Sequence, residues 1–113
     1  MENISFEEKG EITIARARGE WTLGNIKDIE LAFSSMLGKK PGLIALDCKE
    51  LIGVDSTAIA TLVKILRKCK ELNIKLVFFD LSSNIMHTFE LMTLNKFFTI
   101  MTKQKFEKEF GVG

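Results

Sequence analysis

The sequence has few of the features that would indicate an enzyme or a membrane protein. Its 113 residues include one proline, one histidine, one tryptophan, two cysteines and no tyrosine. A single proline and eight glycines exclude a collagen-like or low-complexity chain. The 16 basic and 15 acidic residues leave a net charge of +1, so no overall field attracts nucleic acid or an anionic membrane. The longest apolar runs, such as 76–79, are far too short to span a bilayer.

Chain length and cysteine content predict one domain in a reducing compartment. A chain of 113 residues has room for a single domain, so we expect residues 1–113 to fold as one unit. Cys48 and Cys69 form no Cys-x-x-Cys motif, and we expect both to be buried, reduced thiols. The first eight residues are acidic and contain no apolar segment of the kind found in signal peptides. These features favour a cytoplasmic location.

Hydrophobic periodicity divides the chain into strands and helices. Ile4 and Phe6 alternate with polar residues, and a second alternating run extends from Ile12 to Gly19, which together predict a β-hairpin. Apolar residues at helical spacing predict helices over 25–37, 56–72, 85–92 and 103–110. Short, continuously apolar runs predict further strands over 43–47, 75–79 and 97–100.

The order of these elements predicts an α/β fold. Successive strand, helix and strand pair in parallel through a right-handed crossover, whereas the hairpin adds an antiparallel pair. We therefore expect a mixed β-sheet opened by a β-hairpin, with about four helices packed on it. Asn25 and Gly38 are expected to cap the first helix, and Asn73 is expected to end the second.

The residue combinations that catalysis requires are missing from the sequence. His87 lies off the apolar stripe of its helix, with no nucleophile and acid placed beside it. No glycine-rich phosphate loop occurs, and two cysteines with one histidine cannot complete a zinc site without carboxylates. Asp47 and Asp80 end predicted parallel strands, but the first strands do not supply the paired acids of a phosphoacceptor receiver domain. We therefore expect no enzymatic activity, no cofactor and no metal.

Asp55, Ser56 and Thr57 lie together where the second predicted helix begins. All three residue types are preferred at the N-cap, so capping alone explains their presence. A helix start also presents unpaired amides and a partial positive charge, which suits a phosphate group. A phosphate on Ser56 would add about −1.5 to −2 charges next to Asp55. The small Ala58 in the first turn would let another chain approach closely.

The segment from Leu46 to Ala60, LDCKELIGVDSTAIA, resembles the signature loop of STAS domains, the family of bacterial anti-sigma factor antagonists. The family pattern is a strand, an apolar loop, Asp-Ser-Ser/Thr-Gly/Ala and then a helix. Residues 91–100 are similar to the family's closing segment before its terminal helix, and the opening hairpin followed by Gly19 and Glu20 fits as well. The resemblance covers essentially the whole chain.

The resemblance implies a non-catalytic regulatory switch. In this family the unmodified antagonist binds an anti-sigma factor that is itself a serine kinase. Phosphorylation of the serine after the Asp releases the antagonist, and a serine phosphatase resets it. Carried over to this sequence, Ser56 is the phosphorylation site, and Asp55, Thr57 and Ala58 belong to the partner-binding segment. The implied partners are the kinase and the phosphatase, without direct binding of nucleic acid and without membrane insertion.

The sequence departs from the family pattern at a few positions. Trp21 and Thr22 stand where the family commonly has Leu-Asp, which weakens the carry-over of a partner contact at Thr22. Trp21 is either an exposed aromatic anchor for a partner or a residue packed in the core or at its edge. Ala58 and Thr93 replace frequent glycines. None of these differences removes Ser56.

A basic cluster lies late in the second predicted helix, formed by Lys64, Arg67, Lys68 and Lys70. Cations near a helix C-terminus complement the helix dipole, so the cluster is either a solvated face or a docking patch for an acidic partner. The methionines Met36, Met86 and Met92 are interpreted as core residues.

A second function is compatible with the same fold. STAS-like domains also serve as scaffolds in signalling assemblies and as small subunits of lipid-transport machinery. In that case residues 55–57 would dock on a partner without being phosphorylated, and the chain would purify in a stable membrane-associated assembly. A small α/β enzyme is a third class, but it requires a nucleophile–base pair that the sequence does not supply.

Overall fold

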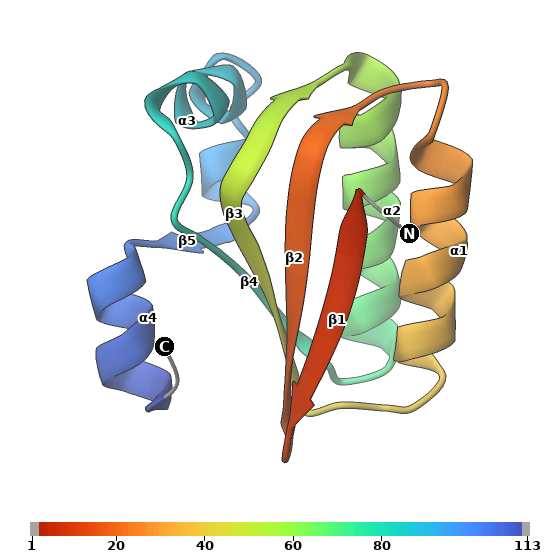
Figure 1. The fold of residues 1–113 in the computed structure, drawn as a ribbon, viewed down its shortest axis with the longest axis vertical. Coiled ribbons are helices and arrows are strands. Elements are labelled where there is room, and N and C mark those ends of the chain that lie inside the picture. The colour runs from red at the N-terminus through yellow and green to blue at the C-terminus, as the bar shows by residue number, and fades with distance from the viewer. Residues whose placement is uncertain (1–2, 112–113) are drawn as a thin grey trace.

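The computed structural model describes residues 3–111, which form a mixed five-stranded sheet with helices on both of its faces (Figure 1). The elements in chain order are β1 (Ile4–Lys9), β2 (Ile12–Trp21), α1 (Ile26–Leu37), β3 (Leu43–Val54), α2 (Ser56–Glu71), β4 (Lys75–Phe79), α3 (Ser83–Leu91), the 3-10 helix η1 (Leu94–Lys96), β5 (Thr99–Met101) and α4 (Lys103–Phe110). The strand order is β1-β2-β3-β4-β5. Only the β1–β2 pair is antiparallel among these neighbours, which confirms the predicted mixed sheet opened by a hairpin.

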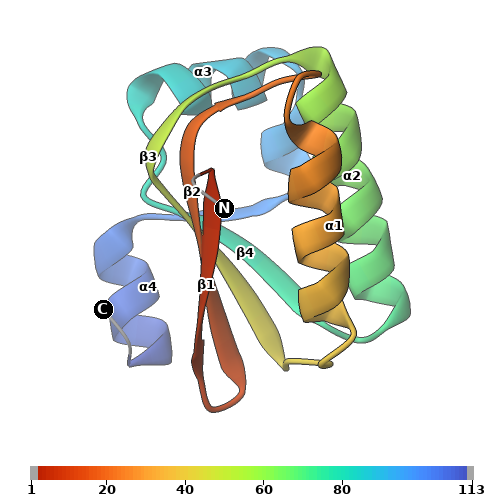
Figure 2. The same cartoon turned by 45° about the vertical axis from the view of Figure 1, so that its right-hand side comes forward.

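The main core lies between the sheet and the helices α1, α2 and α3. Figure 2 shows α1 and α2 side by side on one face of the sheet, with α3 at the end where the parallel strands finish. Trp21, Phe33, Phe78 and Phe89 are fully buried in this layer. Trp21 and Phe78 pack edge-to-face on Phe33 and Phe89, respectively, an arrangement that aromatic rings favour.

A smaller core lies on the opposite face, under α4. Phe106 is fully buried and stacks on Phe79 with ring centroids 4.1 Å apart. Phe110 packs at the margin of the same cluster, so both aromatic residues of α4 face inward as the helical spacing predicts. The central strand β3 is therefore covered on both faces, which explains its continuous apolar run from Leu43 to Leu46.

The end of β3 differs from the prediction. The strand was expected over 43–47, but it continues to Val54 because the later residues pair with the end of β2. Two register shifts interrupt this pairing, one between Arg16 and Arg18 and one between Gly19 and Glu20. The final strand is also displaced, since β5 covers Thr99–Met101 instead of 97–100.

Asn25 and Gly38 occupy the N-cap and C-cap of α1 and Asn73 ends α2, as expected, but neither cap of α1 has the expected geometry. The Asn25 side chain accepts from the Thr22 amide and donates to the Glu20 carbonyl, so it holds the preceding turn and makes no bond to the helix amides. Gly38 keeps a right-handed conformation. Asn73 adopts the left-handed conformation with φ of 58°, and the next amide returns to the Cys69 carbonyl at 2.8 Å.

The predicted burial of the sulfur-containing residues is confirmed for Cys48, Cys69 and Met36 but not for Met86 and Met92. Cys48 and Cys69 are buried, free thiols, as expected. Met36 lies in the main core and Met86 is half-buried. Met92 is 45% exposed because it follows the last residue of α3, so its interpretation as a core residue is wrong.

Candidate functional site

The start of α2 is fixed by Asp55, which is the N-cap of the helix. Its backbone is extended, and its Oδ1 atom accepts a hydrogen bond of 2.9 Å from the Ala58 amide. The Asp55 carbonyl accepts the first helical bond, from the Ile59 amide. Asp55 therefore performs the capping role that the sequence left open among three adjacent residues.

The same carboxylate reaches a second segment of the chain. Its Oδ2 atom accepts a hydrogen bond of 2.9 Å from the Leu23 amide, in the connection between β2 and α1. The Asp55 amide in turn donates to the carbonyl of Trp21, the last residue of β2. The hydrogen bonds that the carboxylate accepts lower the pKa of Asp55 below its ordinary value, with the Ala58 amide contributing most and the Leu23 amide next. The charged form of Asp55 thus ties the β2–α1 connection to the start of α2.

The irregular end of β3 places this site at the carboxyl end of the sheet's central strand. Gly19 pairs with Leu51 and Glu20 pairs with Gly53, so Ile52 is the extra residue of a bulge and has no partner in β2. The Ile52 side chain is 65% exposed as a result. The bulge also bends the strand toward the first turn of α2 (Figure 1).

The predicted partner-binding residues differ in their access to solvent. Ser56 is the first residue of α2 and is exposed, while Asp55 and Thr57 are half-buried. Ala58 is completely buried beneath the first turn, so its side chain offers no surface to a partner. The expected direct contact through Ala58 is therefore wrong, and its small side chain instead allows α2 to pack closely on the core.

Trp21 and Thr22 have separate roles. Trp21 is completely buried, packs edge-to-face on Phe33 and donates its indole N–H to the Asn3 carbonyl at 3.1 Å. The interpretation of Trp21 as an exposed anchor is therefore wrong, and the alternative of core packing is correct. Thr22 is half-buried, and its hydroxyl accepts from the Gly24 amide within the turn that precedes α1.

A shallow hollow of about 240 Å³ brings the predicted residue Thr22 next to Asp55. Its lining residues are Glu20, Thr22, Gly53, Val54 and Asp55. The hollow lies between the end of β2 and the end of β3, beside the exposed first residue of α2. Its two carboxylates give it a negative charge. At about 240 Å³ it is smaller than most small-molecule sites.

Leu23 and Ile52 lie beside the predicted site residues, and the sequence patterns did not single them out. Leu23 is 74% exposed in the β2–α1 connection, and its amide is held by Asp55. With Ile52 it adds exposed apolar surface to this end of the molecule. An apolar residue in the predicted turn before the first helix was the available signal for Leu23, whereas nothing local indicated the bulge that exposes Ile52.

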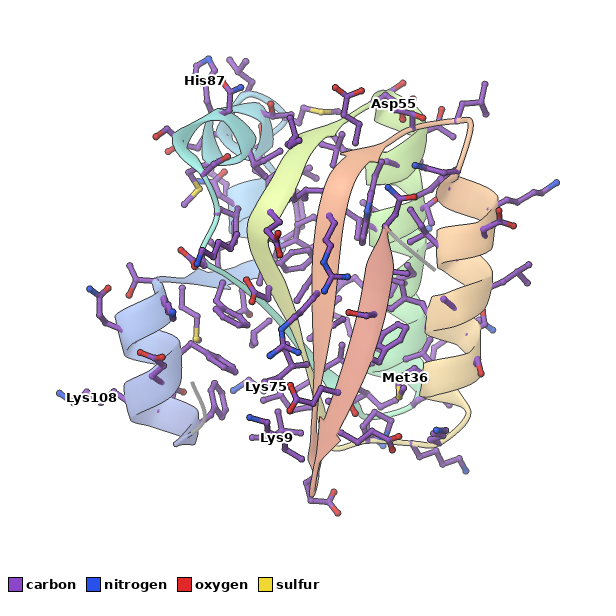
Figure 3. The ribbon with its side chains drawn as sticks, viewed as in Figure 1. Lys9, Met36, Asp55, Lys75, His87 and Lys108 are labelled. Atoms are coloured by element: carbon purple, nitrogen blue, oxygen red, sulfur yellow. The ribbon has the colours of Figure 1, made fainter. Side chains whose placement is uncertain are left out.

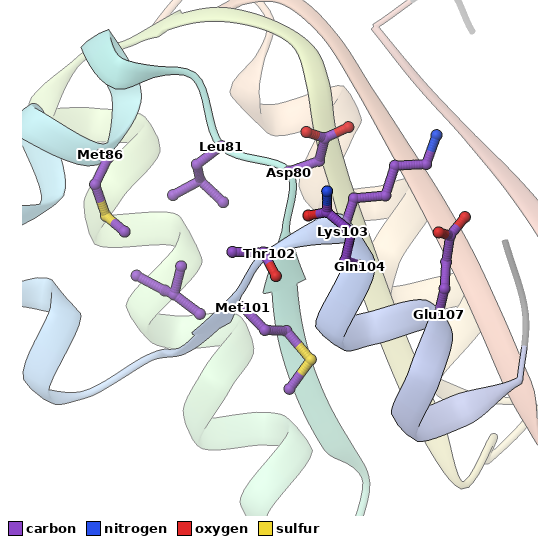
Figure 4. A pocket seen from close by; sticks show the side chains of 9 residues that line it. Asp80, Leu81, Met86, Met101, Thr102, Lys103, Gln104 and Glu107 are labelled. Carbon is purple, nitrogen blue, oxygen red and sulfur yellow. The ribbon is translucent and has the colours of Figure 1, made fainter.

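Two further hollows lie on the α4 side of the sheet. The larger, of about 590 Å³, lies between the β4–α3 connection and the start of α4, and Figure 4 shows Asp80, Met86, Lys103 and Glu107 on its walls. The smaller, of about 280 Å³, shares Asp80 and Lys103 with it. In the part of the chain from 3 to 111, no three acidic, histidine or cysteine side chains lie close enough to hold a metal ion. Across the same residues, no helix is both long and apolar enough to cross a membrane.

Fold and site together define a small α/β domain with an exposed serine, Ser56, at the start of α2, next to the capping residue Asp55. The STAS domain family matches residues 3–107 of the sequence. The chain belongs to the STAS domain family.

Solved structures share this fold at low sequence identity. A candidate anti-sigma factor antagonist from Thermotoga maritima has a TM-score of 0.84 and 16% identity, over 96% of this chain and 95% of that chain. The unphosphorylated anti-sigma factor antagonist SpoIIAA has a TM-score of 0.76 and 15% identity, over 97% of this chain and 98% of that one. Its phosphorylated form, from Bacillus, has a TM-score of 0.70 and 15% identity, over 94% and 97%.

A structure of a different kind shows the same fold. A sulfate transporter family protein from Wolinella succinogenes has a TM-score of 0.74 and 12% identity, over 88% of this chain and 84% of that chain. No curated protein sequence matches this chain. At these identities the structural similarity establishes the fold alone.

Proposed function

We propose that this protein is an anti-sigma factor antagonist whose switch is phosphorylation of Ser56. The unmodified chain binds an anti-sigma factor that is a serine kinase, phosphorylation of Ser56 releases it, and a serine phosphatase restores the binding form. It acts in the cytoplasm as a non-catalytic protein without a cofactor. The observation that carries this proposal is the exposed Ser56 at the first position of α2 in a STAS domain.

Asp55, and not Ser56, caps α2, and this supports the proposal. Asp55 supplies the cap of α2 through its bond to the Ala58 amide, so the Ser56 hydroxyl is not needed to hold the helix. Modification of Ser56 therefore leaves the cap in place. The partial positive charge of the helix N-terminus also favours a phosphate at this position.

The charge change at the surface explains how the partner is released. A phosphate on Ser56 brings about −1.5 to −2 charges at neutral pH. Asp55 and Glu20 are already acidic around the hollow, and Leu23 and Ile52 add exposed apolar surface. An interface formed on this surface would have to desolvate a dianion next to like charges, which is costly. In this proposal Thr57 and Thr22 contribute polar contacts to the same interface.

The phosphoryl transfer assigns one atom of this chain a chemical role. The Ser56 Oγ attacks the γ-phosphorus of ATP that the kinase holds, and the bond between that phosphorus and the oxygen bridging to ADP breaks. The hydroxyl proton passes to a base of the kinase. A reachable hydroxyl is all that this chain has to supply, and exposure of Ser56 meets that requirement.

The experiment is incubation of the chain with ATP and a candidate anti-sigma kinase from the same genome, followed by intact-mass and peptide analysis. We expect a single phosphate, on Ser56, with none on Ser56→Ala. The matched control Ser83→Ala removes an exposed serine at the first position of a different helix, α3, and should be phosphorylated like the wild type. Ser56→Ala should bind the kinase persistently, and Ser56→Asp should bind weakly. Full labelling of Ser56→Ala would contradict the proposal.

A scaffold role is the second candidate, favoured by the structural similarity to the Wolinella succinogenes sulfate transporter family protein. In that case the surface around Asp55 docks permanently on a larger assembly. Native mass spectrometry of the complex purified from its own cells separates the two functions. A stable assembly that survives addition of ATP supports the scaffold, whereas release of phosphorylated chain supports the switch.

A further inference from the structure

A small apolar groove lies between the C-terminal ends of α1 and α2. Its volume is about 260 Å³, and its lining residues are Ser34, Leu37, Gly38, Lys40, Lys68 and Leu72. The apolar walls are Leu37 at the end of α1, which is 6% exposed and belongs to the main core, and Leu72 just after α2, which is 40% exposed. Figure 3 shows that Met36, near this end of α1, lies at the opposite end of the helix layer from Asp55.

Two lysines without ion-pair partners in the described part of the chain line the groove. Lys40 and Lys68 form its rim, and the exposed Arg67 precedes Lys68 on α2. Nearby lysines are neutralised, since Lys39 pairs with Glu8 and Lys64 pairs with Glu30. Within residues 3–111, Lys40, Arg67 and Lys68 take part in no ion pair of this kind. Glu71 is the acidic residue in the last turn of α2, and the rim remains positively charged when it is counted.

The backbone at Lys40 adds a second observation. Lys40 adopts the left-handed conformation with φ of 51°, which a residue with a Cβ atom disfavours and glycine accepts. The helix dipole of α2 accounts for cations near its end, such as Lys68, but it does not account for a lysine in this conformation. Lys40 therefore lines the groove in a backbone conformation that glycine would adopt with less strain.

We propose that this groove is a docking site for an acidic peptide segment of a partner protein. One large apolar side chain of the peptide enters the groove between Leu37 and Leu72, and its carboxylates contact Lys40, Arg67 and Lys68. The volume is below the usual range of small-molecule sites, which starts at about 300 Å³. Among the groove residues none is aromatic, so the stacking platform of a single-stranded nucleic-acid site is missing there.

The docking site is separate from the surface around Ser56. α2 has 16 residues, so its two ends are about 24 Å apart. A partner segment on the groove therefore does not compete for the first turn of α2. Peptide binding should be the same before and after phosphorylation of Ser56, so failure of either proposal is visible without the other.

The test measures fluorescence anisotropy of a fluorescein-labelled dodecapeptide, one leucine flanked by glutamates, against the full chain. We expect binding that weakens with salt, with NMR shift changes at 34–40 and 67–72. Lys40→Glu and Lys68→Glu should each weaken binding at least tenfold. The matched controls Lys105→Glu and Lys108→Glu, which make the same charge change on exposed positions of α4, should change it less than twofold.

Two further variants separate docking from a structural or purely electrostatic role. Lys40→Gly should raise the melting temperature, because it relieves the left-handed lysine, and still weaken peptide binding at least tenfold. A peptide with serine in place of leucine should also bind at least tenfold more weakly. The proposal would be overturned if the leucine and serine peptides bound equally well. It would also be overturned if the α4 variants weakened binding as much as the groove variants, or if the NMR shift changes lay outside 34–40 and 67–72. The proposal would also be overturned if phosphatidylglycerol vesicles or a DNA dodecamer bound the groove residues more tightly than the peptide and displaced it.

Discussion

The Asp55 carboxylate accepts the Leu23 amide across 32 residues of sequence, at 2.9 Å. Its other oxygen accepts the Ala58 amide at the same distance. One side chain therefore caps α2 and also holds the β2–α1 connection against it. Because Ser56 follows Asp55 directly, the shape of the surface around the proposed phosphorylation site depends on this one carboxylate.

Removing the carboxylate should loosen both segments. We expect Asp55→Ala to lower the free energy of unfolding and to speed hydrogen exchange at the Leu23 amide, because neither amide keeps its acceptor. Asp55→Asn retains one acceptor oxygen, so it should show an intermediate loss. Urea unfolding and NMR hydrogen exchange measure the two effects.

The matched control for this prediction is the cap of a different helix. The Ser82 hydroxyl accepts from the Ile85 amide at 3.2 Å at the start of α3. Ser82→Ala should cost about 1 kcal/mol, the usual loss for a missing cap, and leave exchange at Leu23 unchanged. Unchanged Leu23 exchange in Asp55→Ala would show that the bond across the two segments has no influence in solution.

The same bonds predict how the site responds to acid. Hydrogen bonds from Ala58 and Leu23 lower the pKa of Asp55 in the folded chain, relative to about 3.9 in an unfolded one. The stabilisation is therefore fully present above the unfolded pKa and is lost as the pH falls through the lower folded value. The amide shifts of Leu23 and Ala58 should titrate together with a midpoint below 3.9. Separate midpoints, or one above 3.9, would contradict a shared carboxylate.

Local sequence signals predicted one half of the Asp55 arrangement. An Asp at the start of an apolar helical stripe is a local cap, and the structure confirms the start of α2 there. The bond to Leu23 depends on two bulges that set the register of β2 against β3, and pairing between distant segments leaves no local pattern. Asn25 is a second example of a contact that the local pattern did not predict. Its side chain bonds to Thr22 and Glu20 in the preceding turn, and it makes no bond to the amides at the helix start.

Trp21 shows why burial was harder to predict than secondary structure. Trp21 follows the charged residue Glu20 near a predicted turn, so the sequence did not show whether its side chain points into the core or toward solvent. β2 continues to Trp21 only because the end of β3 continues to Val54 and pairs with it. This places the indole against Phe33 of α1. Whether the residue was core or surface thus depended on the register of a neighbouring strand.

The two cysteines should be inert in the folded chain. Burial, together with the neighbouring carboxylates of Asp47 and Asp80, raises the pKa of the Cys48 thiol, and burial raises that of Cys69 to about 11. We expect neither thiol to react with Ellman's reagent at pH 8 in the native state, and both to react in urea. Ser83→Cys provides an exposed control that should react at once. Rapid native labelling of either natural cysteine would contradict the packing of the main core.

A glycine at Thr93 should stabilise the chain. It precedes η1 in the left-handed conformation with φ of 61°, and its side chain is exposed. A residue with a Cβ atom pays about 1–2 kcal/mol in this region, and the added freedom of glycine in the unfolded chain costs about 0.5–1 kcal/mol. Thr93→Gly should therefore gain about 0.5–1 kcal/mol in urea unfolding.

Thr93→Ala keeps the Cβ atom and should gain less. Asn73→Gly should also gain less, because asparagine tolerates the same conformation at φ of 58°. A loss in Thr93→Gly, or an equal gain in all three variants, would show that backbone strain at Thr93 is not released by removing its side chain.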